Sequence, residues 1–310
     1  MPAFSEAIDL VNQSNDIAIL THQNPDGDAV GSILALSLSL NQIGKNIYPR
    51  LVDSVPQVFK FLPSVEMIGN ELPARSDLWI VVDSSNLART GWSGISGDIN
   101  ILVIDHHATA ENFGKVNLID ASASSAGEII FDLFKEMQII IDKDIATCLL
   151  TALSTDTGSF QFSNTSERVL KMAAELVLAG GRLARISENV YNHKSLPQLK
   201  LWGKVLANLR RDDELGINVA VVTTADLAEC DATDEDLEGV VSLLNTVPQT
   251  RATFLISERG EEIKGSIRTE STDVNVAELA KIWGGGGHVK AAGFNVPGHL
   301  QRSGSRWEVA

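Results

Sequence analysis

The chain has little cysteine, a deficit of basic residues and no long apolar run. Its only two cysteines, Cys148 and Cys230, lie far apart among 310 residues, so neither a disulfide framework nor a zinc–thiolate site can be built. The 25 basic residues face 40 acidic ones, and the net charge of -15 disfavours a broad surface for duplex DNA or an anionic membrane. No segment approaches the roughly 18 apolar residues of a membrane span, and the N-terminal MPAFSEAIDL lacks the order of a signal peptide. We therefore expect a protein of the reducing cytoplasm.

The composition that remains, 44% hydrophobic and 21% charged, is that of a globular protein, and the length suggests about two domains. In the first half, helical periodicity alternates with short β-branched runs, which predicts an α/β fold with a parallel sheet flanked by helices. The expected strands are 17–20, 46–51, 78–82, 101–104 and 116–119, and the expected helices are 5–13, 28–43, 125–137, 142–155, 166–179 and 182–191.

A single amphipathic helix is predicted over 195–211, and a new pattern begins after it. We interpret this helix as a connector, which gives domains at 1–192 and 214–310 joined by 193–213. The second domain is predicted to be smaller and mixed α/β. Its expected strands are 217–222, 252–257 and 263–267, and its expected helices are 234–244 and 276–283, followed by a glycine-rich loop.

Acidic and histidine residues follow three of the predicted strands directly. Because the carboxyl ends of parallel strands line one crevice, we expect these side chains to converge there. They are His22, Asp26 and Asp28 after the first strand, Asp83 after 78–82, and Asp105, His106 and His107 after 101–104, with Asp156 closing helix 142–155.

Imidazole nitrogens and carboxylate oxygens without sulfur form a ligand set that suits Mn²⁺ or Mg²⁺. The four negative charges of Asp26, Asp28, Asp83 and Asp156 would be neutralised by two divalent ions. Two such ions can clamp both sides of a phosphoryl group during an in-line displacement, which points to phosphoester hydrolysis. Each residue alone has an ordinary structural explanation, such as a helix cap or a loop histidine, and only their joint occurrence favours the metal site. Ser125 has capping-box spacing with Glu128 and is interpreted as a helix start.

The stretch HQNPDGDAVGS at 22–32, together with Asp83, the Asp105-His106-His107 triplet and Asp156, resembles the four motifs of the DHH phosphoesterase superfamily. The segment GSIRTESTDVNVAELAKIWGGGGHVKAAGF at 265–294 resembles the DHH-associated domain. The length is similar to that of the bifunctional oligoribonuclease and pAp phosphatase (nanoRNase) group and not to the longer RecJ exonucleases.

This resemblance implies roles for the candidate residues and a cofactor of two divalent cations, Mn²⁺ first, with Mg²⁺ or Co²⁺ as alternatives. His22, Asp26 and Asp83 would hold one ion. Asp28, Asp83, His106 and Asp156 would hold the other, so that Asp83 bridges the pair. His107 would contact the substrate phosphate or leaving oxygen, and Asp105 would orient its neighbours.

In the second domain the glycine run is a candidate substrate site. Gly285, Gly286 and Gly287 carry no side chains that would keep a phosphate from their N–H groups, and His288 follows them. Arg268 is suited to bidentate phosphate contact or to stacking on a base. A flexible turn and an exposed strand arginine are the ordinary alternatives, and the resemblance favours substrate binding by Arg268 and His288.

The resemblance implies a metal-dependent phosphoesterase that hydrolyses short oligonucleotides to mononucleotides and dephosphorylates pAp. Its partners would be short oligonucleotides or small nucleotides such as pAp and pApA, with no duplex DNA and no membrane. A linear or cyclic dinucleotide phosphodiesterase is the alternative with the same chemistry, and a non-catalytic nucleotide- or RNA-binding regulator is the alternative from another class. The sequence leaves open the physiological substrate, the direction of attack, the preference for RNA or DNA, and whether the chain forms a homodimer.

Overall fold

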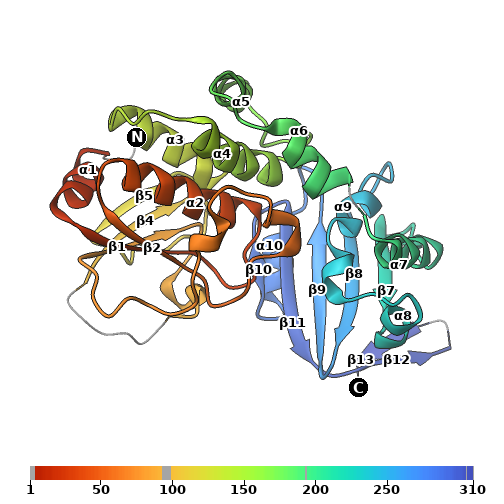
Figure 1. The fold of residues 1–310 in the computed structure, drawn as a ribbon. Coiled ribbons are helices and arrows are strands. Elements are labelled where there is room, and N and C mark those ends of the chain that lie inside the picture. The colour runs from red at the N-terminus through yellow and green to blue at the C-terminus, as the bar shows by residue number, and fades with distance from the viewer. Residues whose placement is uncertain (1–3, 93–98, 193, 305, 310) are drawn as a thin grey trace. The chain divides into compact units, whose positions relative to one another are not determined.

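The computed structural model describes residues 4–92, 99–192, 194–304 and 306–309 (Figure 1). Within these ranges, no helix combines the length and the apolar character needed to cross a membrane. The chain divides into two compact units, residues 1–193 and 194–310. This division assigns the predicted connector helix to the second unit, and the domain boundaries expected at 192 and 213 stay predictions.

The first unit is built on a five-stranded parallel sheet with the order β2-β1-β3-β4-β5. The chain moves outward from β1 to β2 and then returns to the other side of β1 to form β3. The carboxyl ends of β1 and β3 therefore flank a topological switch point, which is where open α/β sheets bind their ligands. The strands are β1 (Asp16–Leu20), β2 (Asn46–Arg50), β3 (Leu78–Val82), β4 (Asn100–Asp105) and β5 (Val116–Ile119).

Helices cover this sheet, and the predicted α/β class is confirmed. They are α1 (Phe4–Gln13), α2 (Gly27–Gln42), α3 (Ala126–Glu136), α4 (Lys143–Asp156), α5 (Glu167–Leu178) and α6 (Leu183–Ile186). The 3-10 turns η1 (Gln57–Phe59), η2 (Val65–Met67) and η3 (Leu87–Thr90) lie in the loops, and a π-helical turn η4 (Ser187–Asn192) follows α6.

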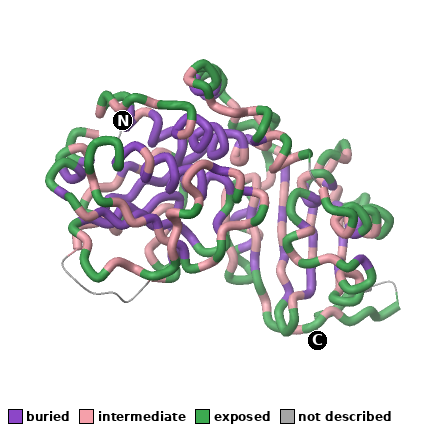
Figure 2. The backbone as a smooth tube through the Cα atoms, in the orientation of Figure 1, coloured by how far each residue is buried: buried purple, intermediate pink, exposed green. Residues whose placement is uncertain are grey.

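The core of the first unit lies between the sheet and helices α2, α3 and α4, where Figure 2 shows the densest burial. All five residues of β3 are buried, as expected for a central parallel strand. Helix α2 is buried along almost its whole length because it packs closely on α4. A methyl group on Gly31 would lie only 2.5 Å from the carbonyl oxygen of Cys148, so glycine permits this approach.

The second unit contains a six-stranded sheet of order β10-β11-β9-β8-β7-β6, in which β7 and β8 are parallel and the other pairs antiparallel. Its strands are β6 (Arg210–Asp212), β7 (Ile217–Val222), β8 (Ala252–Arg259), β9 (Glu262–Arg268), β10 (Gly286–Gly287) and β11 (Ala291–Pro297), with a separate hairpin of β12 (Leu300–Ser303) and β13 (Arg306–Val309). Its helices are α7 (Leu196–Ala207), α8 (Thr224–Glu229), α9 (Val240–Leu244) and α10 (Val276–Lys281), with a 3-10 turn η5 (Asp234–Leu237).

Two apolar clusters join the helices of the second unit to its sheet. One cluster joins α7 and α9 to strands β7 and β8 through residues such as Leu201, Val241 and Leu255. The other joins α10 to β9 and β11 through residues such as Val276 and Phe294. The strands carry buried residues in alternation, as in Ile217–Val222 and Glu262–Arg268.

Three helix predictions in the second unit were wrong in extent. The helix expected over 195–211 ends at Ala207, and Arg210–Asp212 instead pairs with β7. The helix expected over 234–244 is split into η5 and α9 by Gly239, whose φ of +84° is left-handed. The helix expected over 276–283 ends at Lys281, shortly before Gly284 at φ +74°. Helix α8 and strands β6 and β10 to β13 were not predicted.

Candidate metal centre

The carboxyl ends of β1, β3 and β4 deliver the candidate ligands of the first unit. The loop after β1 carries His22 and ends at Asp26, whose side chain caps α2 by accepting the N–H of Ala29 at 3.0 Å. Asp28 then lies in the first turn of α2, and Asp83 follows β3 directly. The end of β4 supplies Asp105, His106 and His107, and Asp156 is the last residue of α4. The expected convergence of these residues is borne out by their distances.

Asp83 stands between two groups of ligand atoms. Its Oδ2 lies 3.4 Å from His22 Nε2, and that nitrogen is 3.9 Å from Asp26 Oδ2. Its Oδ1 lies 3.5 Å from His106 Nε2. The same His106 nitrogen is 3.2 Å from Asp156 Oδ2 and 3.7 Å from Asp28 Oδ2. The two oxygens of one carboxylate thus face different histidines, each with its own acidic partners.

The backbone at Asp83 is unusual, because its φ of +51° lies in the left-handed region that most residues avoid. The conformation is held in part by the N–H of Asp83, which donates to the carbonyl of Ile104 at the end of the neighbouring strand at 3.0 Å. Backbone strain of this kind is concentrated at functional sites, where the surrounding structure maintains it. Here the left-handed turn accompanies a carboxylate that faces both ligand groups.

Asp28 is fully buried and is held by a helix that is distant in the sequence. Its oxygens accept the N–H groups of Ala126 at 2.6 Å and Gly127 at 3.0 Å, and the hydroxyl of Ser32 at 2.9 Å. The first turn of α3 therefore positions this carboxylate. These contacts were not predicted. Ser125 was predicted as the start of α3, and its hydroxyl does accept the N–H of Glu128 at 3.2 Å.

The protonation of the cluster reflects its high density of buried acids. Burial, followed by the nearby charges of Asp83 and Asp156, raises the pKa of Asp28 well above its usual value. Burial also raises the pKa of Asp156, to about 6. Burial alone would raise the pKa of Asp83, but the nearby imidazoles of His106 and His22 bring it well below normal.

The pKa values of the histidines are raised, whereas burial alone would lower the pKa of an imidazole. Burial opposes the charged form of His22, yet its hydrogen bond to Asp83 and the charges of Asp26 and Asp83 raise its pKa to about 9. Asp156 and Asp83 likewise outweigh burial and raise the pKa of His106 well above normal. Without other cations, the imidazolium groups supply the positive charge that these carboxylates require.

This donor set fits divalent cations. The triads His22–Asp26–Asp83 and Asp28–Asp83–His106 each bring one ligand atom per residue within 4.8 Å of the others. The Oδ1 of Asp83 is buried and accepts no well-formed hydrogen bond from the described residues, so it retains capacity to bind a cation. Oxygen and imidazole ligands suit Mn²⁺ or Mg²⁺. Neutral histidines and ionised carboxylates are required for that binding, so metal would displace the protons described above.

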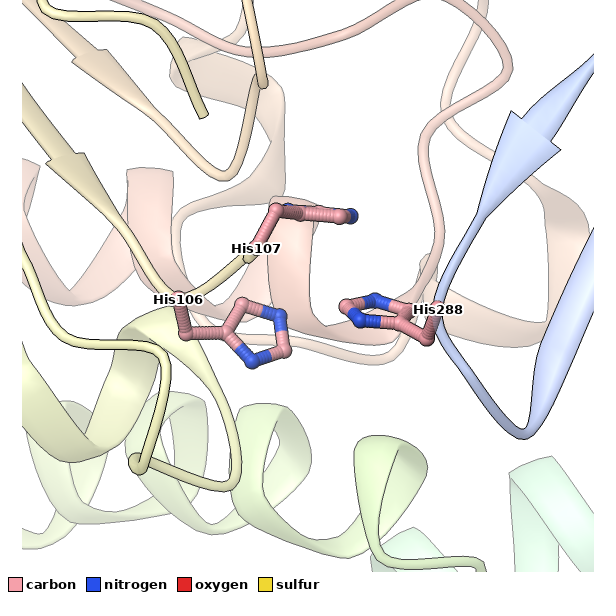
Figure 3. Close-up of side chains that lie close together, drawn as sticks. All are labelled: His106, His107 and His288. Atoms are coloured by element: carbon pink, nitrogen blue, oxygen red, sulfur yellow. The ribbon is translucent and has the colours of Figure 1, made fainter. Parts of the chain in front are cut away.

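Asp105 and His107 form a tight pair beside the cluster. Asp105 is fully buried, and its Oδ1 accepts both the backbone N–H of His107 and, at 2.7 Å, its ring Nδ1. Figure 3 shows His106 and His107 emerging from the end of β4. Their ring centroids are 4.9 Å apart, and their ring planes are inclined at 60°. Both histidines lie 3.5 Å from Asp83 Oδ1, His106 through Nε2 and His107 through Nδ1, and Asp105 in addition fixes the orientation of His107.

In the second unit, the backbones of Arg268 and His288 both pair with Ala291. His288 is also drawn in Figure 3. Arg268 ends β9 and is paired with Ala291, and Ala291 exchanges backbone hydrogen bonds with His288 at 2.7 and 3.2 Å. The Arg268 guanidinium donates to the carbonyl of Ile267, and among the described residues no carboxylate forms an ion pair with it. A half-buried arginine without an acidic partner is suited to an anionic ligand.

The glycine run next to His288 has a structural function of its own. A methyl group on Gly285 would lie 2.2 Å from the carbonyl oxygen of Gly293, and Gly287 has a φ of +140°. The N–H of Gly285 donates to the carbonyl of Ala280 at 3.0 Å. That N–H is thus already bonded within the chain, which weakens the expected phosphate contact by Gly285. Gly286 and Gly287 form the short strand β10 against β11.

Comparison with known proteins identifies the architecture. Residues 16–153 match the N-terminal domain of the DHH family, and residues 216–303 match the DHHA1 domain. The bifunctional oligoribonuclease and PAP phosphatase NrnA of Thermus thermophilus is 33% identical over 285 residues, which cover 91% of this chain and 84% of that protein. The chain belongs to the DHH family. The expected membership is thereby confirmed, with a DHH domain in the first unit and a DHHA1 domain in the second.

Two further comparisons extend the relationship. A solved structure of an exopolyphosphatase-related protein from Bacteroides fragilis matches with a TM-score of 0.88 at 26% identity, over 94% of this DHH chain and 90% of that one. The cyclic-di-AMP phosphodiesterase PdeA of Listeria monocytogenes is 25% identical over 92% of this chain but only 45% of its own length. The chain is therefore similar to proteins named for the cleavage of phosphoanhydride and phosphodiester bonds.

Proposed function

We propose that this DHH-family chain is a divalent-metal-dependent phosphodiesterase that hydrolyses short oligonucleotides to mononucleotides and dephosphorylates pAp. The observation that carries the proposal is the position of Asp83, whose two oxygens face two separate groups of acids and histidine. The oligoribonuclease and phosphatase named among the relatives supports the substrate class. We locate this activity in the cytoplasm, which is consistent with two unpaired cysteines, both buried.

The ligand assignment follows the two groups around Asp83. His22, Asp26 and Asp83 would hold one ion, and Asp28, Asp83, His106 and Asp156 the other, with Mn²⁺ as the first candidate. Two divalent ions, when bound, activate water and stabilise the charge that develops on the phosphoryl group.

We assign to His107 the contact with the substrate phosphate or the leaving oxygen. Asp105 accepts a hydrogen bond from His107 Nδ1, which directs the other ring nitrogen away from the carboxylate. In this arrangement Asp105 positions the imidazole, so that its other nitrogen would contact the phosphate or the departing oxygen.

The DHHA1 domain would hold the nucleotide through side chains. Arg268 without an acidic partner and the neighbouring His288 offer the positive and donor groups that a phosphate requires. Gly286 and Gly287 keep this edge of the domain free of side chains, whereas the Gly285 N–H is used internally. Arg268→Ala should raise KM for nucleotides and leave the metal content unchanged, as measured by steady-state kinetics and metal analysis.

A substrate panel tests the proposal directly. Purified protein is stripped of metal, reloaded with Mn²⁺, Mg²⁺ or Co²⁺, and assayed on pAp, pApA, pGpG, cyclic di-AMP, short RNA and short DNA. We expect no turnover after chelation, restoration by Mn²⁺ and preference for pApA, short RNA and pAp. Asp83→Asn should abolish activity, whereas the exposed Glu136→Gln serves as the matched carboxylate control. Turnover that persists without metal, or that is absent on every substrate, refutes the proposal.

A second candidate is a dinucleotide phosphodiesterase, which the similarity to the Listeria cyclic-di-AMP phosphodiesterase favours. The same panel separates the two. Efficient cleavage of cyclic di-AMP or pGpG with poor cleavage of short RNA would support the second candidate. Binding of nucleotides without turnover would instead indicate a regulator.

A further inference from the structure

The DHH domain must accept a substrate with several negative charges at a centre that is itself strongly acidic. The side chains gathered there include the carboxylates of Asp26, Asp28, Asp83 and Asp156. Two divalent ions would offset four negative charges and bind the phosphate that is cleaved. A phosphate elsewhere in the nucleotide would still need a cationic partner.

Arg89 is bound to the loops that form the centre. It lies in η3, the turn that follows Asp83, and its backbone N–H donates to the side chain of Asn86 at 3.1 Å. Its carbonyl oxygen accepts the N–H of Gln23, the residue after His22, at 2.8 Å. Backbone contacts therefore fix Arg89 beside the loop that carries one of the expected ligands.

The guanidinium of Arg89 is directed toward Ser85, two residues after Asp83. Its Nη1 donates to the Ser85 hydroxyl at 3.4 Å. Ser85 is buried, and its carbonyl accepts the N–H of Glu111 at 2.8 Å, in the loop that follows His107. Ser85 thus connects the loops after β3 and β4, and the charged end of Arg89 lies where they meet.

Among the described residues of this domain, two arginines form ion pairs with acids, and Arg89 belongs to the group that does not. Arg168 pairs with Asp132, and Arg182 pairs with Asp144 at 3.1 Å. Across the part of the chain that the structure describes, Arg89 forms no ion pair, and Ser85 Oγ is the one partner of its guanidinium. The side chain is exposed, so most of its donors remain available to a ligand.

We propose that Arg89 binds a phosphate of the substrate other than the one that is cleaved, such as the 5′-phosphate of pApA. The inference rests on the proposed function and adds a specificity determinant to it. A fork of N–H donors matches two oxygens of a terminal phosphate, which an ammonium group cannot do as well. Arg89 would then favour substrates that carry a 5′-phosphate over those that lack one.

The test removes the phosphate from the substrate and the arginine from the protein in turn. The wild-type chain, Arg89→Ala and Arg89→Lys are assayed on pApA and on ApA, which differ only in the 5′-phosphate. In Arg89→Ala the ratio of kcat/KM for pApA to that for ApA should fall about 10- to 100-fold, the range of a charge-assisted hydrogen bond. Arg89→Lys should recover part of the ratio. Arg185→Ala, an exposed arginine that lies over Phe61, should keep the wild-type ratio.

An unchanged ratio in Arg89→Ala overturns the assignment, because a general loss of rate would affect both substrates equally. Thermal unfolding and Mn²⁺ titration of the variants verify the fold and the metal site. If the wild-type chain cleaves neither substrate, the proposed function fails, and the same comparison is made on binding. Equal affinities of the wild-type chain and Arg89→Ala for pApA, measured by calorimetry, would then refute the role of Arg89.

Discussion

Replacing Gly27 with alanine is expected to separate two carboxylates of the candidate metal centre. Gly27 precedes Asp28 on α2, and Thr155 precedes Asp156 on α4. A methyl group on Gly27 would lie 2.2 Å from Cγ2, 2.6 Å from Oγ1 and 2.8 Å from Cβ of Thr155. Carbon atoms in contact normally lie about 3.5–4.0 Å apart, so α2 and the end of α4 must separate by roughly 1 Å. His106 Nε2 lies between the two acids, 3.7 Å from Asp28 and 3.2 Å from Asp156.

Overpacking of this kind costs about 1–3 kcal/mol of unfolding free energy. For a domain of this size that corresponds to a fall in Tm of roughly 2–4 °C per kcal/mol. A displacement of about 1 Å at a catalytic constellation can lower the rate by about 100-fold. We therefore expect Gly27→Ala to bind Mn²⁺ more weakly in calorimetry and to lose about 10- to 100-fold in kcat/KM on pApA.

Compensation at Thr155 makes the prediction specific. Thr155→Ala removes the two closest atoms and leaves the contact at 2.8 Å, so Gly27→Ala combined with Thr155→Ala should regain part of the Mn²⁺ affinity. The matched control is Gly203→Ala in α7, where a methyl group meets nothing within 4 Å and should be neutral or stabilising. Wild-type Mn²⁺ affinity and rate in Gly27→Ala, or no recovery in the double variant, would refute this account.

Three further predictions follow from the same structure. Asp83→Ala should lower turnover by at least about 1,000-fold and weaken the binding of both ions. Asp83→Asn should fold normally, because asparagine tolerates the left-handed backbone, and should be equally inactive. A variant that still binds both ions in calorimetry would contradict the bridging role. Metal-free protein should lose thermal stability as pH rises. Protonated Asp156, with a pKa of about 6, favours the folded state, and this stabilisation is lost as pH rises through 6. Protonated His22 also stabilises the fold; its stabilisation is complete below pH 6.5 and is lost as pH rises toward its pKa of about 9. Saturating Mn²⁺ should remove this dependence, and a Tm that rises with pH in the metal-free protein would oppose it. Activity should be highest on oligonucleotides of about two to five residues with a shallow salt dependence, and equal kcat/KM from dimer to 24-mer would show that a longer binding track exists.

The strands and most helices of the DHH domain could be predicted because their signals are local. Strands β3 and β5 have the bounds that their apolar runs indicate. The DHHA1 domain was predicted less well, since its helices are short and interrupted. Gly239 breaks one apolar pattern in two, and Arg210–Asp212 leaves the helical pattern to pair with a strand. Pairing partners of this kind lie outside any local window.

The amino-acid sequence by itself determined which residues stand at the strand ends and which ions their oxygens and nitrogens suit. Only the tertiary structure decided how they are held. Asp28 is buried against the first turn of α3, about a hundred residues later in the chain. Asp83 adopts a left-handed backbone, and Arg89 joins the loops of β1 and β3 through Gln23 and Ser85. Residue types follow from the chain alone, but these hydrogen bonds form only when distant segments pack together, because folding brings their donors and acceptors within reach.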